Sequence, residues 1–401
     1  MFNILKTYFS PFPFLLLCLY VFFMFTAQKT LLPIIIHSVV MYSMVGAVLG
    51  YALLKKKVLI TGFSIWYGIF FLFCVISTAL CLQSDTSILF PVATSLIISF
   101  CFIQLINSTD KLEACLNIYV ISAVVMALML WQTGQLDYLY IDAQREMRLG
   151  TEVTGNANIF TALFMYSGVF AAWFMVYEKK KMSRLIYLLA FVFILFIMIV
   201  SGGRKTIIAI MGALGVFLVM KESGHKKKII KNTILAIAIV AGIFVTILNV
   251  PLLYDLIGER FEGLFDFFTG KGSNVSSDDT RGQIFVLALK GWLEQPLLGH
   301  GIDSFKSFNR AVTGHFYYAH NNFAELLYDV GIVGFALFYY MFIYIYKKLK
   351  LVKTDYYKYK ILGYGLLVEL LIFDVGGVSY YLVGNIVILA ITYLCITLQK
   401  T

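Results

Sequence analysis

The sequence predicts an all-α polytopic membrane protein of about 12 transmembrane helices, with one large outer loop between spans 9 and 10. Hydrophobic residues make up 60% of the 401 residues and charged residues only 13%. In soluble domains, roughly a quarter of the residues are charged. Runs of about 20 apolar residues, enough to cross a hydrocarbon core about 30 Å thick, recur along the chain. Because lipid offers no partners for backbone groups, these runs must be helices, and they are too long for barrel strands.

Nine expected spans precede the large loop and three follow it. They lie near residues 12–26, 31–53, 59–82, 87–106, 115–131, 158–177, 185–200, 206–220, 229–248, 322–346, 361–376 and 379–398. Residues 1–401 therefore form a single membrane domain. The first apolar run lacks a small-residue cleavage site, so we expect a retained helix rather than a removed signal.

The basic residues orient the bundle. With the N-terminus inside, 21 of the 32 Lys and Arg residues fall in cytoplasmic segments, and only Lys231, at the start of the ninth span, overlaps a span. Short inner loops carry this excess, as the positive-inside tendency requires. Both termini are therefore expected in the cytoplasm. The net charge of +10 is explained by topology, and no nucleic-acid partner is expected.

Two outer segments exceed the length of a turn, residues 132–157 and 249–321, and loops this long usually carry function. Residues 249–321 form a periplasmic or extracellular loop in which short interfacial helices are expected. One such helix is indicated by apolar positions at helical spacing, before Pro296 and Gly299 end it: Ile284, Phe285, Leu287, Ala288, Leu289, Trp292 and Leu293.

The outer face collects cations and histidines that the positive-inside tendency would disfavour, so an anionic ligand is expected there. They are Arg145, Arg148, Arg204, Lys205, Arg260, Arg281, Arg310, His300, His315 and His320. Each also has a structural explanation. Arg204 can be a charged turn residue, Arg281 a salt-bridged helix cap, and His320 a structural histidine at an interface.

The six cysteines lie in or beside apolar runs without ligand-like spacing, so neither a disulfide framework nor a zinc site is indicated. The large loop has no DxD pair of the kind that holds a divalent cation at a sugar diphosphate. No metal and no cofactor are expected.

Four motifs, taken together, resemble the superfamily of O-antigen ligases and Wzy-type O-antigen polymerases, which are bacterial membrane glycosyltransferases. They are TGNANIFTALF, SGGRK, RGQIFVLALKGWLEQPLLGHGIDSF and HNNFAELLYDVGIVGFALF, within residues 150–340. That family carries an outer loop late in the chain, an arginine-bearing turn before it and a histidine at its end. Arg204, Arg281 and His320 match these positions. The turn departs from the family pattern, because Gly202 and Gly203 separate Ser201 from Arg204.

The resemblance implies a GT-C-like fold and the transfer of a glycan from an undecaprenyl-diphosphate carrier to an acceptor hydroxyl. The catalytic candidates are Arg204 and Arg281, which would stabilise the leaving diphosphate, and His320, which would act as a base or as a hydrogen-bonding group. The candidates for substrate binding are Lys205, Asn321, Tyr317, Tyr318, Arg310, Arg145 and Arg148.

We favour a metal-independent, inverting polymerase of lipid-linked repeat units, of O-antigen or capsule type, over a ligase that moves the finished glycan to a lipid or protein. A flippase or transporter is disfavoured. Many twelve-helix transporters consist of two six-span halves joined by a cytoplasmic connection, whereas the large loop expected here lies outside, between spans 9 and 10. The expected location is the bacterial inner membrane, with the site on the periplasmic or extracellular side. The expected partners are undecaprenyl-diphosphate-linked donor and acceptor, the bilayer and a chain-length regulator.

Overall fold

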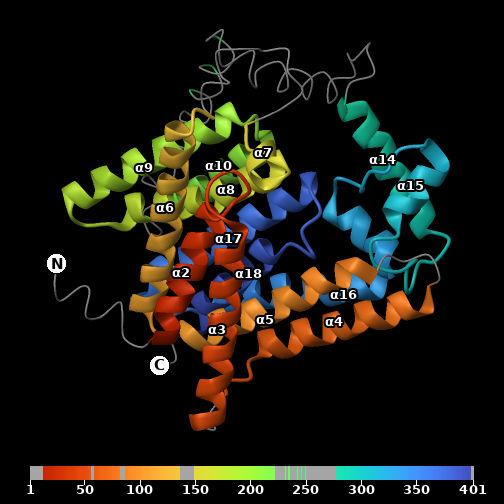
Figure 1. The fold of residues 1–401 in the computed structure, drawn as a ribbon, viewed down its shortest axis with the longest axis horizontal. Helices are drawn as coiled ribbons and strands as arrows, with labels where there is room; N and C mark the ends of the chain where they lie inside the picture. Colours follow the sequence, from red (N-terminus) through yellow and green to blue (C-terminus); the bar gives the residue numbers. More distant parts are fainter. Residues whose placement is uncertain are drawn as a thin grey trace.

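The computed structural model describes residues 12–55, 58–81, 86–135, 149–221 and 277–398, with five single positions between 231 and 249. All regular elements in these residues are helices (Figure 1). They are α2 (Phe12–Thr26), α3 (Ile34–Lys55), α4 (Gly62–Leu80), η1 (Thr86–Ile88), α5 (Leu89–Leu105), α6 (Thr109–Gln132), α7 (Thr151–Thr154), α8 (Ala157–Tyr177), α9 (Lys181–Val200), α10 (Arg204–Lys221), α14 (Ser277–Trp292), α15 (Phe305–Thr313), α16 (Asn322–Leu349), η4 (Thr354–Tyr356), α17 (Tyr357–Gly376) and α18 (Val383–Thr397).

The predicted all-α membrane class is confirmed. In the described part of the chain, 7 helices are long and apolar enough to cross a membrane, and two shorter apolar ones are α2 and α18. The 7 candidates include α3, α4, α6, α8, α9 and α16, together with the η1–α5 pair. The ninth expected span, near residues 229–248, lies almost wholly outside the described residues. The total of twelve spans and the position of the loop therefore remain predictions.

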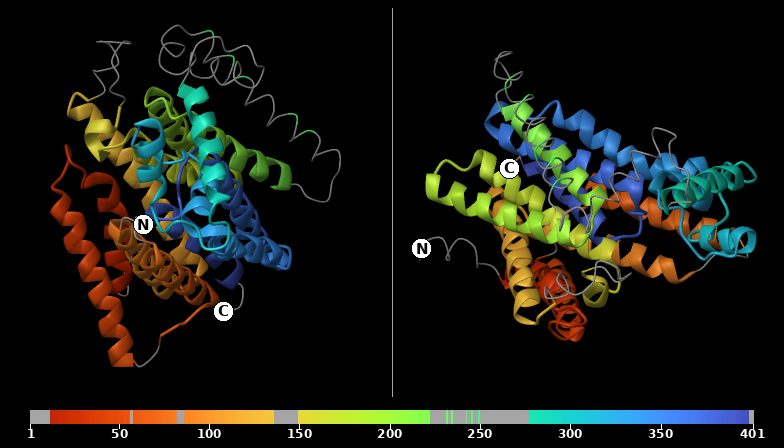
Figure 2. Two further views of the ribbon diagram at one scale, coloured as in Figure 1. Left: turned by 90° about the vertical axis from the view of Figure 1, so that its right-hand side faces the viewer. Right: turned by 90° about the horizontal axis from the view of Figure 1, so that it is seen from above.

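Helix α8 lies at the centre of the bundle. Its apolar window is 89% buried, whereas that of α3 is 11% buried, so α3 stands at the periphery. Helices α6, α9 and α10 pack around α8, and α10 runs along α17. Large aromatic side chains such as Trp173 and Phe170 fill this interior. Figure 2 shows the bundle from its end and from above.

Polar side chains fix where α8 and α16 begin. Asn156 caps α8 by accepting a hydrogen bond from the Asn158 backbone N–H at 2.8 Å. Asn321 caps α16 by accepting one from the Ala324 backbone N–H at 3.0 Å. Asparagine is favoured at this position because its side-chain oxygen satisfies a donor that has no partner within the helix. Both caps belong to motifs that the sequence singled out.

Helix α16 is interrupted at Gly331, whose φ of 64° and ψ of −174° are not helical. Residues 296–301, named here the inserted segment, occupy the break. Because the break leaves helical N–H and C=O groups without partners, the inserted segment must supply them. Four backbone hydrogen bonds do so: Ile332 N to Pro296 O at 2.9 Å, Val333 N to Leu297 O at 3.3 Å, His300 N to Tyr328 O at 2.9 Å and Gly301 N to Asp329 O at 2.8 Å.

Replacing Gly331 with alanine is expected to destabilise the protein by at least about 2 kcal/mol, because the positive φ is strained for alanine. A Cβ atom there would also lie 2.3 Å from the Leu297 carbonyl oxygen. Thermal unfolding of the purified protein in detergent measures this. Gly215→Ala in α10 is the matched control, since apart from its chain neighbours and its own helix backbone no atom lies within 4 Å of its Cβ position. Equal melting temperatures for the two variants would contradict the account of the break.

Helices α14 and α15 form a small second cluster at one end of the bundle. The buried side of α14, with Ile284 and Ala288, packs against Phe305 of α15 and Tyr328 of α16. The predicted helix is therefore present, and its apolar face packs on protein. It begins at Ser277, earlier than expected, because Ser and Asp are favoured in a first helical turn.

Candidate active site

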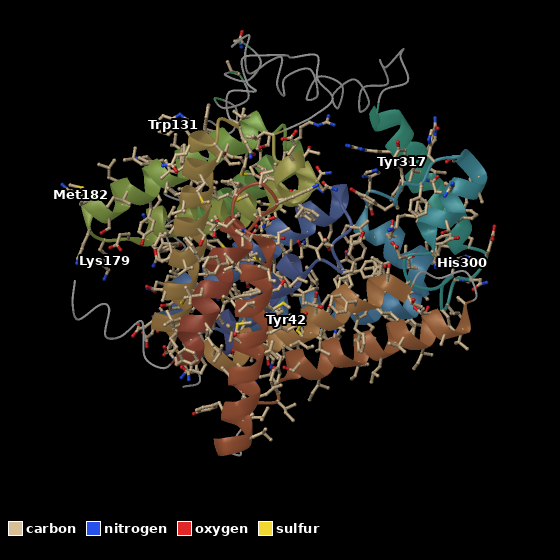
Figure 3. The ribbon with its side chains drawn as sticks, in the orientation of Figure 1. Tyr42, Trp131, Lys179, Met182, His300 and Tyr317 are labelled. Carbon is tan, nitrogen blue, oxygen red and sulfur yellow. The ribbon has the colours of Figure 1, made fainter. Side chains whose placement is uncertain are left out.

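The candidate site lies at the end of the bundle that carries α14 and α15. Labelled side chains at this end include Tyr317 and His300, whereas Lys179 and Met182 mark the opposite end (Figure 3). Four segments distant in sequence supply the site: the start of α8, the turn before α10, helix α14, and the loop that leads into α16. The fold thus brings the four family-like motifs together at one end.

His320 is held in a fixed backbone conformation directly before α16. Its φ is 54°, a value that few residues other than glycine adopt. The backbone N–H of Ala319, on one side, donates to the buried Glu325 carboxylate. On the other side, Asn321 caps α16 and its amide donates to the Val375 carbonyl oxygen at 3.1 Å. These anchors offset the strain of the positive φ.

The electrostatic environment of His320 keeps its imidazole neutral. Burial, followed by the cations of Arg281 and Lys205, lowers the pKa of His320 from 6.5 to about 4. Both effects disfavour the imidazolium, because a partly buried ring loses hydration and like charges repel. Arg281 and Lys205 must lie near His320 to act in this way. The structure therefore brings together three residues that the sequence predicted as one site.

The acidic limb of kcat/KM is expected near pH 4 and not near the ordinary histidine value of 6.5, because His320 loses its proton-accepting form only below its lowered pKa. Protonation of His320 should therefore not lower kcat/KM as the pH falls from 7 to 5. The measurement is kcat/KM against pH with purified lipid-linked substrate. An acidic limb near pH 6.5 that is absent in His320→Ala would show that the pKa of His320 is not lowered, and it would contradict this prediction.

Arg281 lies in the second turn of α14 and is exposed. The sequence predicts Arg281 as a cap just ahead of this helix, but α14 begins at Ser277 and includes it. Its charge acts on both aromatic neighbours of the loop, since it lowers the pKa of His320 and counteracts the burial that raises the pKa of Tyr318. An exposed guanidinium can form paired hydrogen bonds with an anionic group.

The SGGRK turn positions Arg204 and Lys205. Gly202 adopts a φ of 67°, which closes α9 and directs the chain into α10, so the glycines make the tight turn that the sequence predicted. Arg204 is the first residue of α10. The Lys205 ammonium donates to the Gly376 carbonyl oxygen at 3.0 Å and lies 4.1 Å from the centre of the Phe373 ring. Lys205 thus joins α10 to the C-terminal end of α17, where a cation is favoured.

Tyrosine rings flank His320 in the loop. The Tyr318 ring centre lies 4.2 Å from that of His320, and the Tyr317 ring centre 6.4 Å. Tyr317 is 48% exposed and stacks on His315. Tyr318 is half-buried, and the nearby Asn158 side chain counteracts the burial that raises the pKa of Tyr318.

The other predicted binding residues occupy different places. Arg310 is exposed in the last turn of α15. Asn321 uses both ends of its amide to anchor the chain, so its hydrogen bonds support the loop. Arg145 and Arg148 lie outside the described residues.

Two residues of the site went unrecognised in the sequence analysis. Asn158 belongs to the TGNANIF motif, and its contact with Tyr318 joins that motif to the histidine loop. The carboxylate of Glu325 accepts a hydrogen bond from the Ala319 N–H, directly before His320. Its other oxygen, Oε1, is buried with no hydrogen-bond partner. Only the spacing of five residues from His320, on the next helix, hinted at this contact.

Asp329 has a structural role. One carboxylate oxygen accepts hydrogen bonds from the Asp303 N–H at 3.0 Å and the Tyr380 hydroxyl at 2.8 Å, and the other accepts one from the Phe305 N–H at 3.3 Å. The carboxylate therefore ties the start of α15 to α16. Within the described residues, no three His, Cys, Asp or Glu side chains gather as metal ligands would. Metal independence stays a prediction.

One family model matches part of the chain. No curated protein matches the chain. The sequence model of the family described as O-antigen ligase matches residues 189–339. The match runs from α9 through the turn at Arg204, helix α14 and His320 into α16, so it contains the three catalytic candidates. Residues 189–339 therefore match an O-antigen ligase domain, which supports the resemblance to the superfamily of O-antigen ligases and Wzy-type polymerases.

Proposed function

We propose that this protein is a membrane glycosyltransferase that polymerises oligosaccharide repeat units carried on undecaprenyl diphosphate. The observation that carries the proposal is the placement of Arg281 and Lys205 within electrostatic reach of His320, at one end of a helical bundle. Two fixed cations suit a diphosphate, and a neutral imidazole suits an acceptor hydroxyl. The matched family supports the reaction class.

In the proposed reaction, the acceptor hydroxyl attacks the anomeric carbon from the face opposite the diphosphate. The new C–O bond forms as the bond to the diphosphate oxygen breaks, which inverts the configuration. The electron pair leaves with the diphosphate, and the hydroxyl proton passes to His320. Guanidinium groups of Arg281 and Arg204 would stabilise the departing charge through charge-assisted hydrogen bonds, each about 1.5 to 3 kcal/mol.

Substrate binding would adjust the basicity of His320. In the free protein, Arg281 and Lys205 help to lower its pKa to about 4, which makes the imidazole a weak base. A bound diphosphate brings negative charge beside the same cations, so it would offset their repulsion and raise the pKa of His320. The base would then strengthen only when the donor is in place. Tyr317, which is exposed beside His320, would stack on a sugar ring.

Reconstitution with purified lipid-linked repeat units tests this function, with products separated by size. A ladder of glycans on the carrier lipid supports the polymerase. The description of the matched family as O-antigen ligase favours ligation as the second candidate, and transfer of one finished block to a different acceptor would identify it. The absence of any new glycosidic bond would reject both and revive the transporter.

The setting that we propose follows from the same reaction. The bundle would lie in the bacterial inner membrane with both termini in the cytoplasm. Its site would face the periplasm or the exterior, where flipped lipid-linked units are available, and a chain-length regulator would be a further partner. Cysteine labelling at Lys400 and at Tyr317 from either side of the membrane distinguishes this orientation from the reverse one.

A further inference from the structure

A groove between α6 and α9 lies away from the candidate site. It encloses a volume of about 680 Å³, within the range of about 300 to 1,000 Å³ that is usual for ligand pockets. Its walls are mostly apolar: Asn117, Val120, Ile121, Val124, Val125 and Leu128 from α6, and Ser183, Ile186, Tyr187, Leu189, Ala190 and Phe193 from α9. Ile186 is 58% exposed and Leu189 60%, so the groove opens on the outside of the bundle.

The groove has the length of one bilayer leaflet. On α9 its lining runs from Ser183 to Phe193, and ten residues of helix rise about 15 Å. This is half of a hydrocarbon core about 30 Å thick. An acyl chain that entered beside Ser183 would therefore reach the middle of the membrane. The polar groups of the walls are Ser183, at that entrance, and the Tyr187 hydroxyl, which donates to the Asn117 side chain at 2.6 Å.

Basic side chains surround the entrance. Lys179, Lys180 and Lys181 are exposed just before Ser183, and Arg184 is exposed just after it. One carboxylate lies among them, that of Glu178, which accepts hydrogen bonds from the backbone N–H groups of Lys179 and Lys180. The cluster thus keeps an excess of positive charge. Figure 3 shows Lys179 and Met182 at the end of the molecule opposite Tyr317 and His300.

We propose that this groove binds one anionic phospholipid from the leaflet at the end opposite the candidate site. An acyl chain fills the space between α6 and α9, and the phosphate headgroup lies among Lys179, Lys180, Lys181 and Arg184. Charge complementarity selects the anionic headgroup, because each lysine near a membrane surface attracts acidic lipid. The site is independent of the proposed reaction, and the bound lipid would seal the contact between α6 and α9.

Native mass spectrometry of the full-length protein tests the proposal, after delipidation in detergent and titration with palmitoyl-oleoyl phosphatidylglycerol or the matching phosphatidylcholine. We expect one tightly bound phosphatidylglycerol, preferred by at least about tenfold. The triple variant K179Q/K180Q/K181Q should lose that preference. The matched control K347Q/K348Q/K350Q, which removes three exposed lysines at the end of α16, should keep it.

A second pair of variants tests the groove itself. Ala190→Trp fills it from α9 and Val124→Phe fills it from α6, so each should weaken the binding of both lipids. Equal affinity for the two lipids, or unchanged phosphatidylglycerol binding in both groove variants, would overturn the proposal. Displacement of the lipid by undecaprenyl diphosphate would assign the groove to substrate instead, and a mass of two chains without lipid would assign it to a dimer.

Discussion

Replacing His320 with alanine is expected to abolish long glycan products while lipid-linked repeat units accumulate and the protein remains inserted and abundant. The expected loss in kcat is about 10² to 10⁴-fold, the usual contribution of a positioned proton acceptor. The His320 ring lies beside that of Tyr318 and is within electrostatic reach of Arg281 and Lys205. The measurement is single-turnover bond formation with purified donor and acceptor.

His315→Ala is the matched control for this prediction. His315 lies five residues earlier in the same loop, is exposed, and stacks on Tyr317 rather than lying among the cations. We expect it to retain near-normal activity. If His320→Ala made glycans of normal length, or if His315→Ala were the inactive variant, the assignment of the proton acceptor would be wrong. His320→Gln adds a further distinction, since activity retained there would indicate hydrogen bonding without proton transfer.

Replacing Arg281 with alanine is expected to lower kcat/KM by about 10²-fold or more, as the loss of one donor to developing negative charge does in other enzymes. A second effect follows from the structure. Because the Arg281 cation helps to lower the pKa of His320, its removal should raise that pKa towards 6.5. The acidic limb of the residual activity should therefore move to higher pH. Steady-state kinetics across pH 4 to 8 measures both effects.

Two further variants sharpen this test. Lys290→Ala removes an exposed cation from the last turn of the same helix and should leave both the rate and the pH profile unchanged. Arg281→Lys keeps the charge but not the paired hydrogen bonds of a guanidinium, so it should preserve the position of the acidic limb while it slows the reaction. A normal kcat/KM in Arg281→Ala would show that Arg281 has only a structural role in α14.

The helices were predictable from the sequence wherever hydropathy alone defines them. Helix α2 was expected at residues 12–26 and is found there, and α8 begins within one residue of the expected start. The prediction was less accurate where a polar turn begins the helix. Helix α6 was expected from residue 115 but starts at Thr109, because Ser108 caps a first turn too polar for a hydropathy window to include.

The sequence predicted the functional side chains of the candidate site, but not the residues that hold them in place. Residue type and motif spacing indicated Arg281, Lys205 and His320, and the structure brings them together. The contacts of Glu325 with Ala319 and of Asn158 with Tyr318 depend on how distant segments fold against one another. The break at Gly331 was not predicted either, because its hydropathy continues that of the surrounding helix.

The break at Gly331 has a consequence for biogenesis. Half of α16 obtains its first hydrogen bonds from residues 296–301, which belong to the segment that precedes it in the chain. A newly inserted α16 therefore cannot mature as a helix in lipid before that segment has folded back into it. In the chain, His320 lies between residues 296–301 and the break at Gly331. Its backbone conformation would therefore be completed only at this late step of assembly, and an immature protein would have Arg281 and Lys205 without a correctly positioned His320.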